Sequence, residues 1–510
     1  MTWLEDDRKT FTNIVFGDEK MKILLINPPF KTEYGKFSRD QRSPAITKSG
    51  TLYYPTWLAS ATGVLEEAGF ECKLIDCCAR LIKTNEALDI VRDVAPQIVV
   101  INTSTPSIYN DCRFAEKVKE INNEIYTVLV GTHPSAVPEE TMKNCTAIDF
   151  IARREYEFTL KELAEQLKNE QKDFSKILGL TYRNEDGEIS SNADRPFIEN
   201  LDALPFVSKV YKKHGIKPED YFFAAAEFPM MMIFTGRGCP NNCFFCVYPQ
   251  TFHGRQKYRL RSPENVVQEI EYILENFPEL KSLGFEDDTF TADLERTKQI
   301  CRLMIQKGFN KKINWWVNAR VTLDLDTMLL MKEAGCRLLI AGFESGNQNV
   351  LNAMHKGIKL DWSKRYVENA RKAGLLIHGC FMVGNPGETK ETMEETFQLA
   401  LKLNTDTAQF FPLMVYPGTD AYRWAEKNSY IITQDYSKWI TDDGLHSCVL
   451  SFPNLTAEEM VAFCDQARKR YYLRPAYIIA KLKQFIICPA ERKRLYKAGT
   501  RFVKFLFRKD

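Results

Sequence analysis

The chain has 510 residues, which is too long for one ordinary hydrophobic core and predicts two or three domains. Its 44% hydrophobic and 27% charged residues, with a net charge of only +2, are typical of a globular protein and exclude a disordered or fibrous one. No stretch approaches the roughly 20 uncharged apolar residues that cross a bilayer. Residues 1–20 form a polar leader without the apolar core of a signal peptide, so we expect a cytoplasmic protein.

The first predicted elements occupy residues 21–167, where apolar runs of strand length alternate with helical stretches. The series begins with the strand "MKILLINPPF" and the helix "TWLASATGVLEEAGF", and four further strands are predicted at "ECKLIDC", "QIVVIN", "YTVLV" and "AIDFIA". This alternation predicts an α/β fold that starts with a doubly wound, Rossmann-like domain. Ligands of such sheets bind at the carboxyl ends of the strands, where the Ser, Thr and Gly loops fall.

The rest of the chain divides into three predicted segments. Residues 168–227 are irregular in composition and predict a linker with a hairpin around Asp186 and Gly187. Six strands with crossover helices over residues 228–450 predict a partial (β/α)6 barrel of the TIM type, with chemistry at the carboxyl ends of its strands. Its first helix is expected to start at Pro263, after Ser262 as its N-cap. Residues 451–510 predict a basic, helical C-terminal region.

Cysteines are numerous, and three of them form a motif. Fourteen cysteines in a large cytoplasmic chain predict thiols and metal chemistry, not a disulfide framework. Cys239, Cys243 and Cys246 follow the first barrel strand with C-x3-C-x2-C spacing, which suits three irons of a four-iron, four-sulfur (4Fe-4S) cluster whose fourth iron is open to a small molecule. A structural zinc ion is the alternative, but its best fourth ligand, His253, lies seven residues beyond Cys246.

With Phe245 before its last cysteine, this motif resembles that of the radical S-adenosylmethionine (SAM) superfamily. The resemblance implies that the amino and carboxylate groups of S-adenosyl-L-methionine bind the open iron. It further implies that reductive cleavage of SAM releases a 5′-deoxyadenosyl radical, which abstracts hydrogen from an unactivated carbon. An external electron donor, such as flavodoxin or ferredoxin, is implied as a partner.

The resemblance continues along the five following strands, which end in "GFEDDTF", "NAR", "GFESG", "GCFMVGNPGET" and "VYPGT". These stretches stand in the order in which the superfamily places its cofactor contacts. The resemblance therefore implies a set of SAM-binding residues: Phe245, Glu286, Asp287, Asp288, Arg320, Glu344, Ser345 and Gly384.

The first domain resembles that of the cobalamin-binding subfamily of these enzymes. Its loops "NTSTPS" and "VGTHPSAVPEE" imply contacts to the cobalamin tail from Thr103, Ser104, Thr105, Ser107, Gly131 and His133. The D-x-H-x-x-G motif, whose His supplies the lower axial ligand in other corrinoid methyltransferases, is missing from the first strand–helix loop, so the lower ligand is left unassigned. A degenerate α/β domain retained for packing is the alternative.

Within this subfamily, residues 21–418 look most like the hopanoid-biosynthesis-associated radical SAM proteins, in stretches such as "DALPFVSKVYKKH" and "EDDTFTADLERT". The resemblance implies C-methylation or skeletal rearrangement, including ring contraction, of a lipid-like or other small apolar substrate. The alternatives are a radical methylthiotransferase acting on tRNA, which would carry three further cluster cysteines in its first domain, and a non-catalytic corrinoid or iron–sulfur electron-transfer protein. No catalytic acid or base is assigned; the candidates for facing the substrate are Tyr248, His253, Cys380, Tyr416 and His446.

Positive charge is concentrated at the C-terminus, where residues 468–510 hold fourteen Lys or Arg and only two acidic residues. One predicted helical face carries Phe502, Phe505 and Leu506 beside Arg501, Lys504 and Arg508. Such a segment suits peripheral contact with the inner face of a membrane, and a helix packed on the barrel with a solvated basic face is the alternative. No nucleic-acid partner is expected, because the charge is confined to the terminus and no RNA-binding module is apparent.

Overall fold

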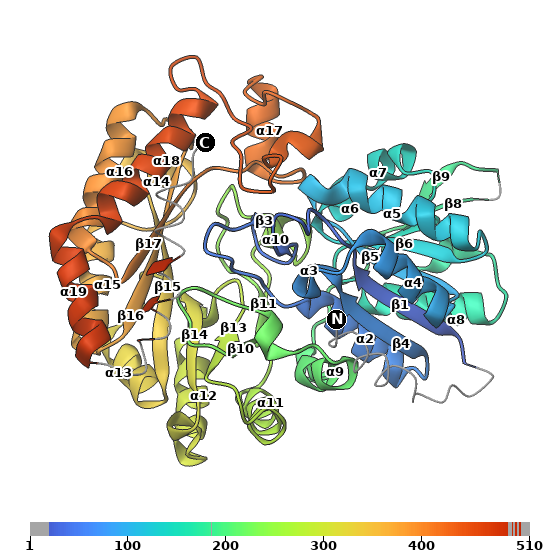
Figure 1. Ribbon diagram of the computed structural model, residues 1–510, viewed down its shortest axis with the longest axis horizontal. Helices are drawn as coiled ribbons and strands as arrows, with labels where there is room; N and C mark the ends of the chain where they lie inside the picture. Colours follow the sequence, from blue (N-terminus) through green and yellow to red (C-terminus); the bar gives the residue numbers. More distant parts are fainter. Residues whose placement is uncertain (1–19, 185, 488–491, 493–494, 497–498, 501–510) are drawn as a thin grey trace.

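The computed structural model describes residues 20–184, 186–487, 492, 495–496 and 499–500. Most of the leader and the predicted helical face at Arg501, Phe502, Lys504, Phe505, Leu506 and Arg508 lie outside the described residues. The described chain forms two α/β units that lie side by side, with helices at the C-terminal end (Figure 1).

The first unit is built on a seven-stranded sheet with strand order β4-β1-β5-β6-β7-β8-β9. The first five of these strands are parallel, and β8 and β9 are antiparallel additions. In chain order the strands are β1 (Lys22–Asn27), β4 (Glu71–Asp76), β5 (Ile98–Asn102), β6 (Tyr126–Val130), β7 (Phe150–Ala152), β8 (Leu180–Arg183) and β9 (Ile189–Ser191). The β1 and β5 strands are almost entirely buried, as strands covered on both faces must be.

The predicted hairpin around Gly187 is confirmed, but its predicted place in a linker is not. Strand β8 pairs with β7, so the hairpin β8–β9 extends the first sheet beyond residue 167. Composition cannot reveal this, because strand pairing is a contact between distant residues.

Helices cover both faces of the first sheet (Figure 1). They are α2 (Thr56–Glu67), α3 (Cys77–Arg80), α4 (Thr84–Val94), α5 (Ile108–Ile121), α6 (Thr132–Ala136), α7 (Pro138–Asn144) and α8 (Glu157–Lys168). A short two-stranded ribbon, β2 (Phe37–Ser38) with β3 (Ala45–Ile46), lies in the loop between β1 and α2. Helix α9 (Val207–His214) follows the hairpin and packs on α2 and on α11 (Pro263–Asn276) of the second unit.

The second unit is a six-stranded parallel sheet whose strands follow one another in chain order, which confirms the predicted partial barrel. Its strands are β10 (Met230–Ile233), β13 (Ser282–Phe285), β14 (Asn314–Ala319), β15 (Cys336–Glu344), β16 (Leu376–Val383) and β17 (Thr407–Pro412). The helices between them are α10 (Val247–Thr251), α11 (Pro263–Asn276), α12 (Leu294–Gln306), α13 (Leu325–Glu333), α14 (Gln348–Ala353), α15 (Leu360–Lys372) and α16 (Lys390–Leu403). The Ser262 side chain caps α11, as expected.

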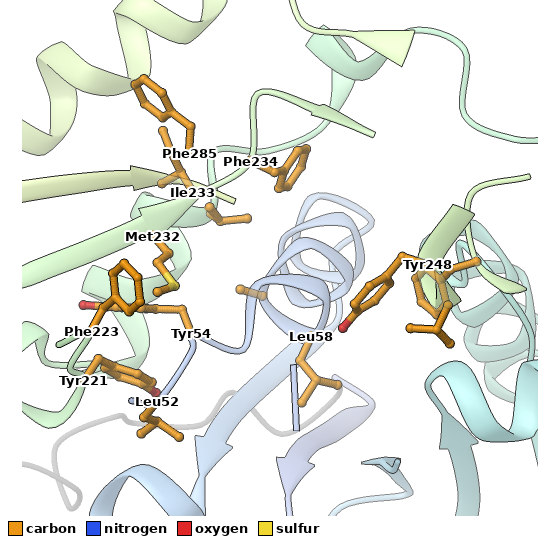
Figure 2. Close-up of a cluster of buried hydrophobic side chains, with 14 of the residues drawn as sticks. Leu52, Tyr54, Leu58, Tyr221, Phe223, Met232, Ile233, Phe234, Tyr248 and Phe285 are labelled. Carbon is orange, nitrogen blue, oxygen red and sulfur yellow. The ribbon is translucent and has the colours of Figure 1, made fainter. Parts of the chain in front are cut away.

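The two units share one continuous hydrophobic core. Tyr54, just before α2, stacks on Tyr221 with ring centroids 3.8 Å apart, and its hydroxyl donates a hydrogen bond of 2.8 Å to the carbonyl of Met230 on β10. Figure 2 shows Tyr54 and Leu58 of the first unit among side chains of the barrel, such as Met232 and Tyr248, and of the segment before it, such as Phe223. The units are therefore packed as one body and not merely tethered.

The C-terminal helices are α17 (Asp420–Lys427), α18 (Ala457–Tyr472) and α19 (Pro475–Ile487). Helix α18 packs along β17, the last strand of the open barrel. Among the described residues, every helix is too short or too polar to span a lipid bilayer.

One expectation about the cysteines is wrong. Cys112 of α5 and Cys145, just after α7, form a disulfide with their Cα atoms 5.5 Å apart, whereas the sequence predicts free thiols. The two residues are 33 positions apart, and only the packing of α5 beside the end of α7 brings them together.

Candidate active site

The three motif cysteines lie on the loop between a short strand and α10, and all three line one large cavity. The sequence did not predict that strand, β11 (Gly236–Gly238), which pairs with β12 (Tyr258–Leu260). This pairing joins the two ends of the segment that contains the cysteine loop and α10. The Gln250 side chain donates hydrogen bonds to the carbonyls of Cys243, Phe244 and Cys246 at 2.9–3.1 Å. Sequence reasoning missed Gln250, whose role is to shape the loop from α10.

The acidic stretch after β13 divides into two kinds of residue. Asp288 lines the cavity beside the cysteines. Asp287 is buried and turned away from it, and its carboxylate accepts hydrogen bonds from the Thr235 hydroxyl and from the backbone N–H groups of Thr235 and Gly236 at 2.6–3.0 Å. Although the resemblance implies cofactor binding for both, Asp287 is placed where it anchors the start of the cysteine loop.

Glu286 and Asp288 meet a cation that the sequence did not predict. Arg42, from the loop between β2 and β3, pairs with the Glu286 carboxylate and lies 3.5 Å from Asp288. Burial raises the pKa of Glu286, and the charge of Arg42 opposes that rise. Within the described residues, the second carboxylate oxygen of Glu286 is buried and has no hydrogen-bond partner. An unsatisfied acceptor at this position fits the ammonium group of SAM.

The next strands bring a second charge pair to the cavity. Lys356 lies 2.6 Å from Glu344, at the end of β15, and Arg320, after β14, donates a hydrogen bond to the Lys356 carbonyl at 3.3 Å. Burial disfavours the Lys356 ammonium, but the Glu344 carboxylate more than offsets this, so the pKa of Lys356 is raised. Arg320, Glu344 and Lys356 all line the cavity with Phe245.

Ser345 and Gly384, which are also predicted to bind SAM, lie outside the cavity lining, as Glu286 and Asp287 do. The Ser345 hydroxyl bonds the Thr396 hydroxyl at 3.2 Å and accepts from the Asn347 N–H, so it stabilises the start of α14. Gly384 lies against Met460 of α18. Both positions serve local packing in this arrangement.

The residues predicted to bind the cobalamin tail gather at the carboxyl ends of β5 and β6. Thr103, Ser104, Thr105, Ser107 and His133 are all buried there. The His133 ring lies 3.2 Å from the Thr105 hydroxyl, and burial lowers the pKa of His133 to about 3. Gly131 has a φ of 123°, and a Cβ at that position would lie 2.2 Å from the Thr103 carbonyl oxygen, so only glycine lets the two loops approach. Small hydroxyl side chains at this sheet edge fit the polar tail of a cobalamin.

Arg42 also stands between the two sites. Besides the large cavity, it lines a narrow recess together with Thr105, Thr132 and Tyr248, which come from both units. Tyr248 is fixed there by a hydrogen bond of 2.9 Å to the Asp40 carbonyl. The recess thus lies between the cobalamin-side loops and the cysteine side of the barrel.

The large cavity has a volume of about 820 Å³. It extends from the cysteine loop along the whole length of β17, and its lining there is mainly apolar. Of the five residues considered for the substrate side, Cys380, Tyr416 and His446 line it. Ser43 joins two of them, with its hydroxyl 3.0 Å from the Tyr416 hydroxyl and 3.3 Å from the His446 ring.

The fifth of those residues, His253, is not at the cavity. Its ring lies 2.9 Å from the buried carboxylate of Glu155, which also receives Arg259 at 2.5 Å and has Arg237 at 3.7 Å. This network joins the first unit to β11 and β12 of the barrel. The zinc alternative relied on His253, and here that ring serves the interface instead.

Comparison with known proteins agrees with this arrangement. The profile of the radical SAM superfamily matches residues 233–400, and that of the B12 binding domain matches residues 42–164. An uncharacterized methyltransferase, PH0819 of Pyrococcus horikoshii, is 33% identical over 460 residues, which is 90% of this chain and 94% of that protein. The chain belongs to the cobalamin-binding radical SAM enzymes.

Other relatives of this radical SAM enzyme include the anaerobic magnesium-protoporphyrin IX monomethyl ester cyclase of Cereibacter sphaeroides, 26% identical over 83% of this chain and 67% of that protein. Among solved structures, the radical SAM methyltransferase TsrM from Kitasatospora setae, with cobalamin and an iron–sulfur cluster bound, superposes with a TM-score of 0.68 at 17% identity, covering 90% of both chains. The cobalamin-dependent radical SAM enzyme OxsB gives a TM-score of 0.67 at 16% identity, over 95% of this chain and 72% of that one.

The cofactors of the enzyme are a 4Fe-4S cluster, S-adenosyl-L-methionine and cobalamin. The residues present fit all three groups. Three thiols and Asp288 line one cavity, and Glu286, with its unsatisfied oxygen, shares the Arg42 contact with Asp288. Small polar residues gather at the carboxyl edge of the first sheet.

Proposed function

We propose that this enzyme functionalises an unactivated carbon of a lipid-like or other small apolar substrate by C-methylation, with skeletal rearrangement as the outcome to be distinguished from it. The observation that carries the proposal is the mainly apolar cavity that begins at the cysteine loop and follows β17. A cavity of this kind binds a substrate by burying apolar surface and uses its few polar groups for orientation. The relative PH0819 is named a methyltransferase, which supports the choice of methyl transfer.

When bound, the reduced cluster and SAM supply a 5′-deoxyadenosyl radical, and cobalamin supplies a methyl group or an electron. In the proposal, Cys239, Cys243 and Cys246 hold the cluster through their thiolates. Glu286 and Asp288 accept the ammonium of SAM in place of Arg42, and Arg320 pairs with its carboxylate.

The rest of the cavity is proposed to position the substrate. The apolar residues of β17 orient its hydrocarbon part and exclude water, so that hydrogen abstraction is confined to the carbon nearest the cysteine loop. Burial lowers the pKa of His446 to about 4, so this ring is neutral at pH 7 and, with Ser43 and Tyr416, offers hydrogen bonds and not charge to a polar substrate group.

The proposal includes two further elements. Reduction of the cluster needs an external one-electron donor, such as flavodoxin or ferredoxin. The enzyme is also proposed to work in the cytoplasm, where such one-electron donors are available.

The tRNA methylthiotransferase alternative finds no support in the first unit. The cysteines there are Cys72 on β4, Cys77 and Cys78 in α3, and the disulfide pair Cys112–Cys145.

The test is an anaerobic incubation of the reconstituted enzyme with SAM, a strong reductant and fractions of a lipid extract. Formation of 5′-deoxyadenosine together with S-adenosylhomocysteine, and a product heavier by one methylene, is the expected result for C-methylation. Formation of 5′-deoxyadenosine without S-adenosylhomocysteine identifies rearrangement. The Cys246→Ala variant is the matched control and should form neither compound, because it lacks one cluster ligand.

Two results would overturn the proposal. One is intact SAM under strong reductant despite a full cluster. The other is turnover only with water-soluble fractions, such as peptides or sugars, and none with lipid fractions.

A further inference from the structure

Helix α19 exposes an apolar face that the rest of the described chain leaves uncovered. It has no fully buried residue, yet most of its side chains are apolar. Ile479, Leu482, Ile486 and Ile487 are 52%, 57%, 69% and 77% exposed. Ile479, Leu482 and Ile486 are spaced by three and four residues, so they share one face of the helix. Apolar side chains this exposed, and gathered on one element, mark a surface that binds something else.

The charged side chains of α19 itself are all basic, and one of them, Lys481, lies 3.5 Å from Asp406. Helix α19 contains Lys481 and Lys483 and no acidic residue. In the sequence, residues 468–510 carry a surplus of twelve positive charges. Lys483 is exposed beside the apolar face. Cations flanking an apolar helical face are complementary to anionic lipid headgroups over hydrocarbon, which is how interfacial helices bind a membrane without crossing it.

The same helix lines the far end of the active-site cavity. Ile478, Leu482 and Phe485 of α19 contribute to its wall, as do the residues of β17 from Thr407 to Pro412. Helix α19 is held there by the Tyr477 hydroxyl, which donates to the Asp406 carbonyl at 2.8 Å. The cavity therefore extends from the cysteine loop to the helix whose outer face is apolar. In Figure 1, α19 lies at the outer edge of the barrel, on the side away from the first unit.

We propose that α19 docks on the surface of an anionic membrane, and that a substrate with a hydrocarbon chain passes from the bilayer into the cavity beside it. The second part rests on the proposed function. The first part rests only on the exposed face and its charge. The geometry gives a physical reason for the coupling, because an apolar molecule that leaves the bilayer next to α19 reaches the cavity without crossing water.

The first experiment measures binding of the full-length protein to vesicles by co-sedimentation. Vesicles of equal parts phosphatidylcholine and phosphatidylglycerol should bind the protein, vesicles of phosphatidylcholine alone should bind it at least tenfold more weakly, and raised salt should weaken binding to the anionic vesicles. The double variant Ile479→Gln/Ile486→Gln should lower the partition coefficient at least tenfold. Neither residue lines the cavity, so the active site is left unchanged.

The matched control carries the same change at two exposed apolar residues elsewhere. Leu329 of α13 and Ile432 are 47% and 54% exposed, and the variant Leu329→Gln/Ile432→Gln should bind vesicles like the unchanged protein. Equal binding by both double variants would overturn the proposal, as would no binding to anionic vesicles. A concentration-dependent dimer that the α19 double variant abolishes would also overturn it, because α19 would then be covered by a second copy of the chain.

The second experiment separates delivery from catalysis. The substrate is the extract fraction that supports turnover. When this fraction is dispersed in detergent, the α19 double variant should form 5′-deoxyadenosine as fast as the unchanged enzyme. With the same fraction in anionic vesicles, its rate should fall at least tenfold. If the protein binds vesicles but turns over no lipid fraction, the proposed function is refuted and the membrane-docking proposal is not. If the unchanged enzyme and the α19 double variant each turn over the fraction equally fast from detergent and from vesicles, delivery through α19 is refuted.

Discussion

Two adjacent aspartates show how much the surroundings of a residue decide its role. Asp287 and Asp288 have the same chemistry, yet Asp287 is 1% exposed and receives three hydrogen bonds from Thr235 and Gly236, whereas Asp288 faces the cavity. Burial raises the pKa of Asp287, and those hydrogen bonds with the charge of Arg296 oppose the rise. Asp287 is directed at Thr235 and Gly236 and Asp288 at the cavity, so one carboxylate serves the loop and the other the site.

Changing each aspartate to asparagine should therefore affect a different property: stability and iron content for Asp287, and SAM affinity for Asp288. Asp287→Asn replaces an acceptor with an amide that cannot accept all three bonds, so we expect a loss of about 1–3 kcal/mol of stability and a lower iron content after anaerobic reconstitution. Asp288→Asn should keep its iron and bind SAM about tenfold more weakly, because a charge-assisted hydrogen bond is lost. Iron analysis and equilibrium dialysis with SAM measure the two effects, and weaker SAM binding by an iron-replete Asp287→Asn variant would contradict this division.

At the scale of elements, the β11–β12 pair decides where the cysteine loop begins. Gly238, the last residue of β11, precedes Cys239 directly and has a φ of 81°. A Cβ at this position would lie 2.1 Å from the Lys257 carbonyl oxygen, so the approach of the two strands depends on glycine. A displacement here moves the first cluster ligand.

Gly238→Ala should consequently reduce both stability and iron content. Gly187→Ala is the matched control, because Gly187 has the same φ of 81° but nothing within 4 Å of an added Cβ, and it lies in the β8–β9 turn far from the cysteines in sequence. Both variants should lose about 1 kcal/mol of unfolding free energy, measured by thermal unfolding, because alanine is strained at a positive φ. Only Gly238→Ala should lose cluster absorbance, and equal absorbance in the two variants would show that β11 does not position Cys239.

At the scale of the whole molecule, a buried charge network joins the two units. Glu155, just before α8, contacts Arg237, His253 and Arg259, which flank the barrel's cysteine loop, and all four are buried. Burial alone would raise the pKa of Glu155, but hydrogen bonds from Arg259 and His253 and the charge of Arg237 lower it well below its usual value. The charged form of Glu155 thus stabilises the joined molecule.

The sign of this shift gives a pH-dependent prediction. A lowered pKa contributes stability that is fully present above the unfolded value of about 4.3 and is lost as the pH falls below it. Glu155→Gln should therefore be less stable than the unchanged protein by about 3 to 5 kcal/mol at pH 7, because three cationic or basic partners lose their carboxylate. The difference in melting temperature should shrink as the pH is lowered below about 4.3. Glu165→Gln, in an exposed i,i+4 pair with Lys161, is the control and should change little at either pH.

Local pattern was sufficient for most of the fold and for the cluster. The apolar periodicity predicted the parallel strands of both sheets, and the spacing of Cys239, Cys243 and Cys246 predicted an open cluster on a loop after a strand. These features are local, because a strand's buried face and a ligand loop are each encoded in a few consecutive residues. The membership of the superfamily followed from the same residues and is confirmed by comparison.

Contacts between distant residues were decided only by the tertiary structure. No local pattern relates the residues that these contacts join or separate. Examples are the pairing of β8 with β7, the contact of Arg42 with Glu286 after β13, and the Cys112–Cys145 disulfide. The opposite directions of Asp287 and Asp288 are another. The extent of the cavity along β17 to α19 belongs to the same class. The sequence alone determined which chemistry this protein can host, because motifs are short; the tertiary structure decided which side chains face it, because packing couples positions hundreds of residues apart.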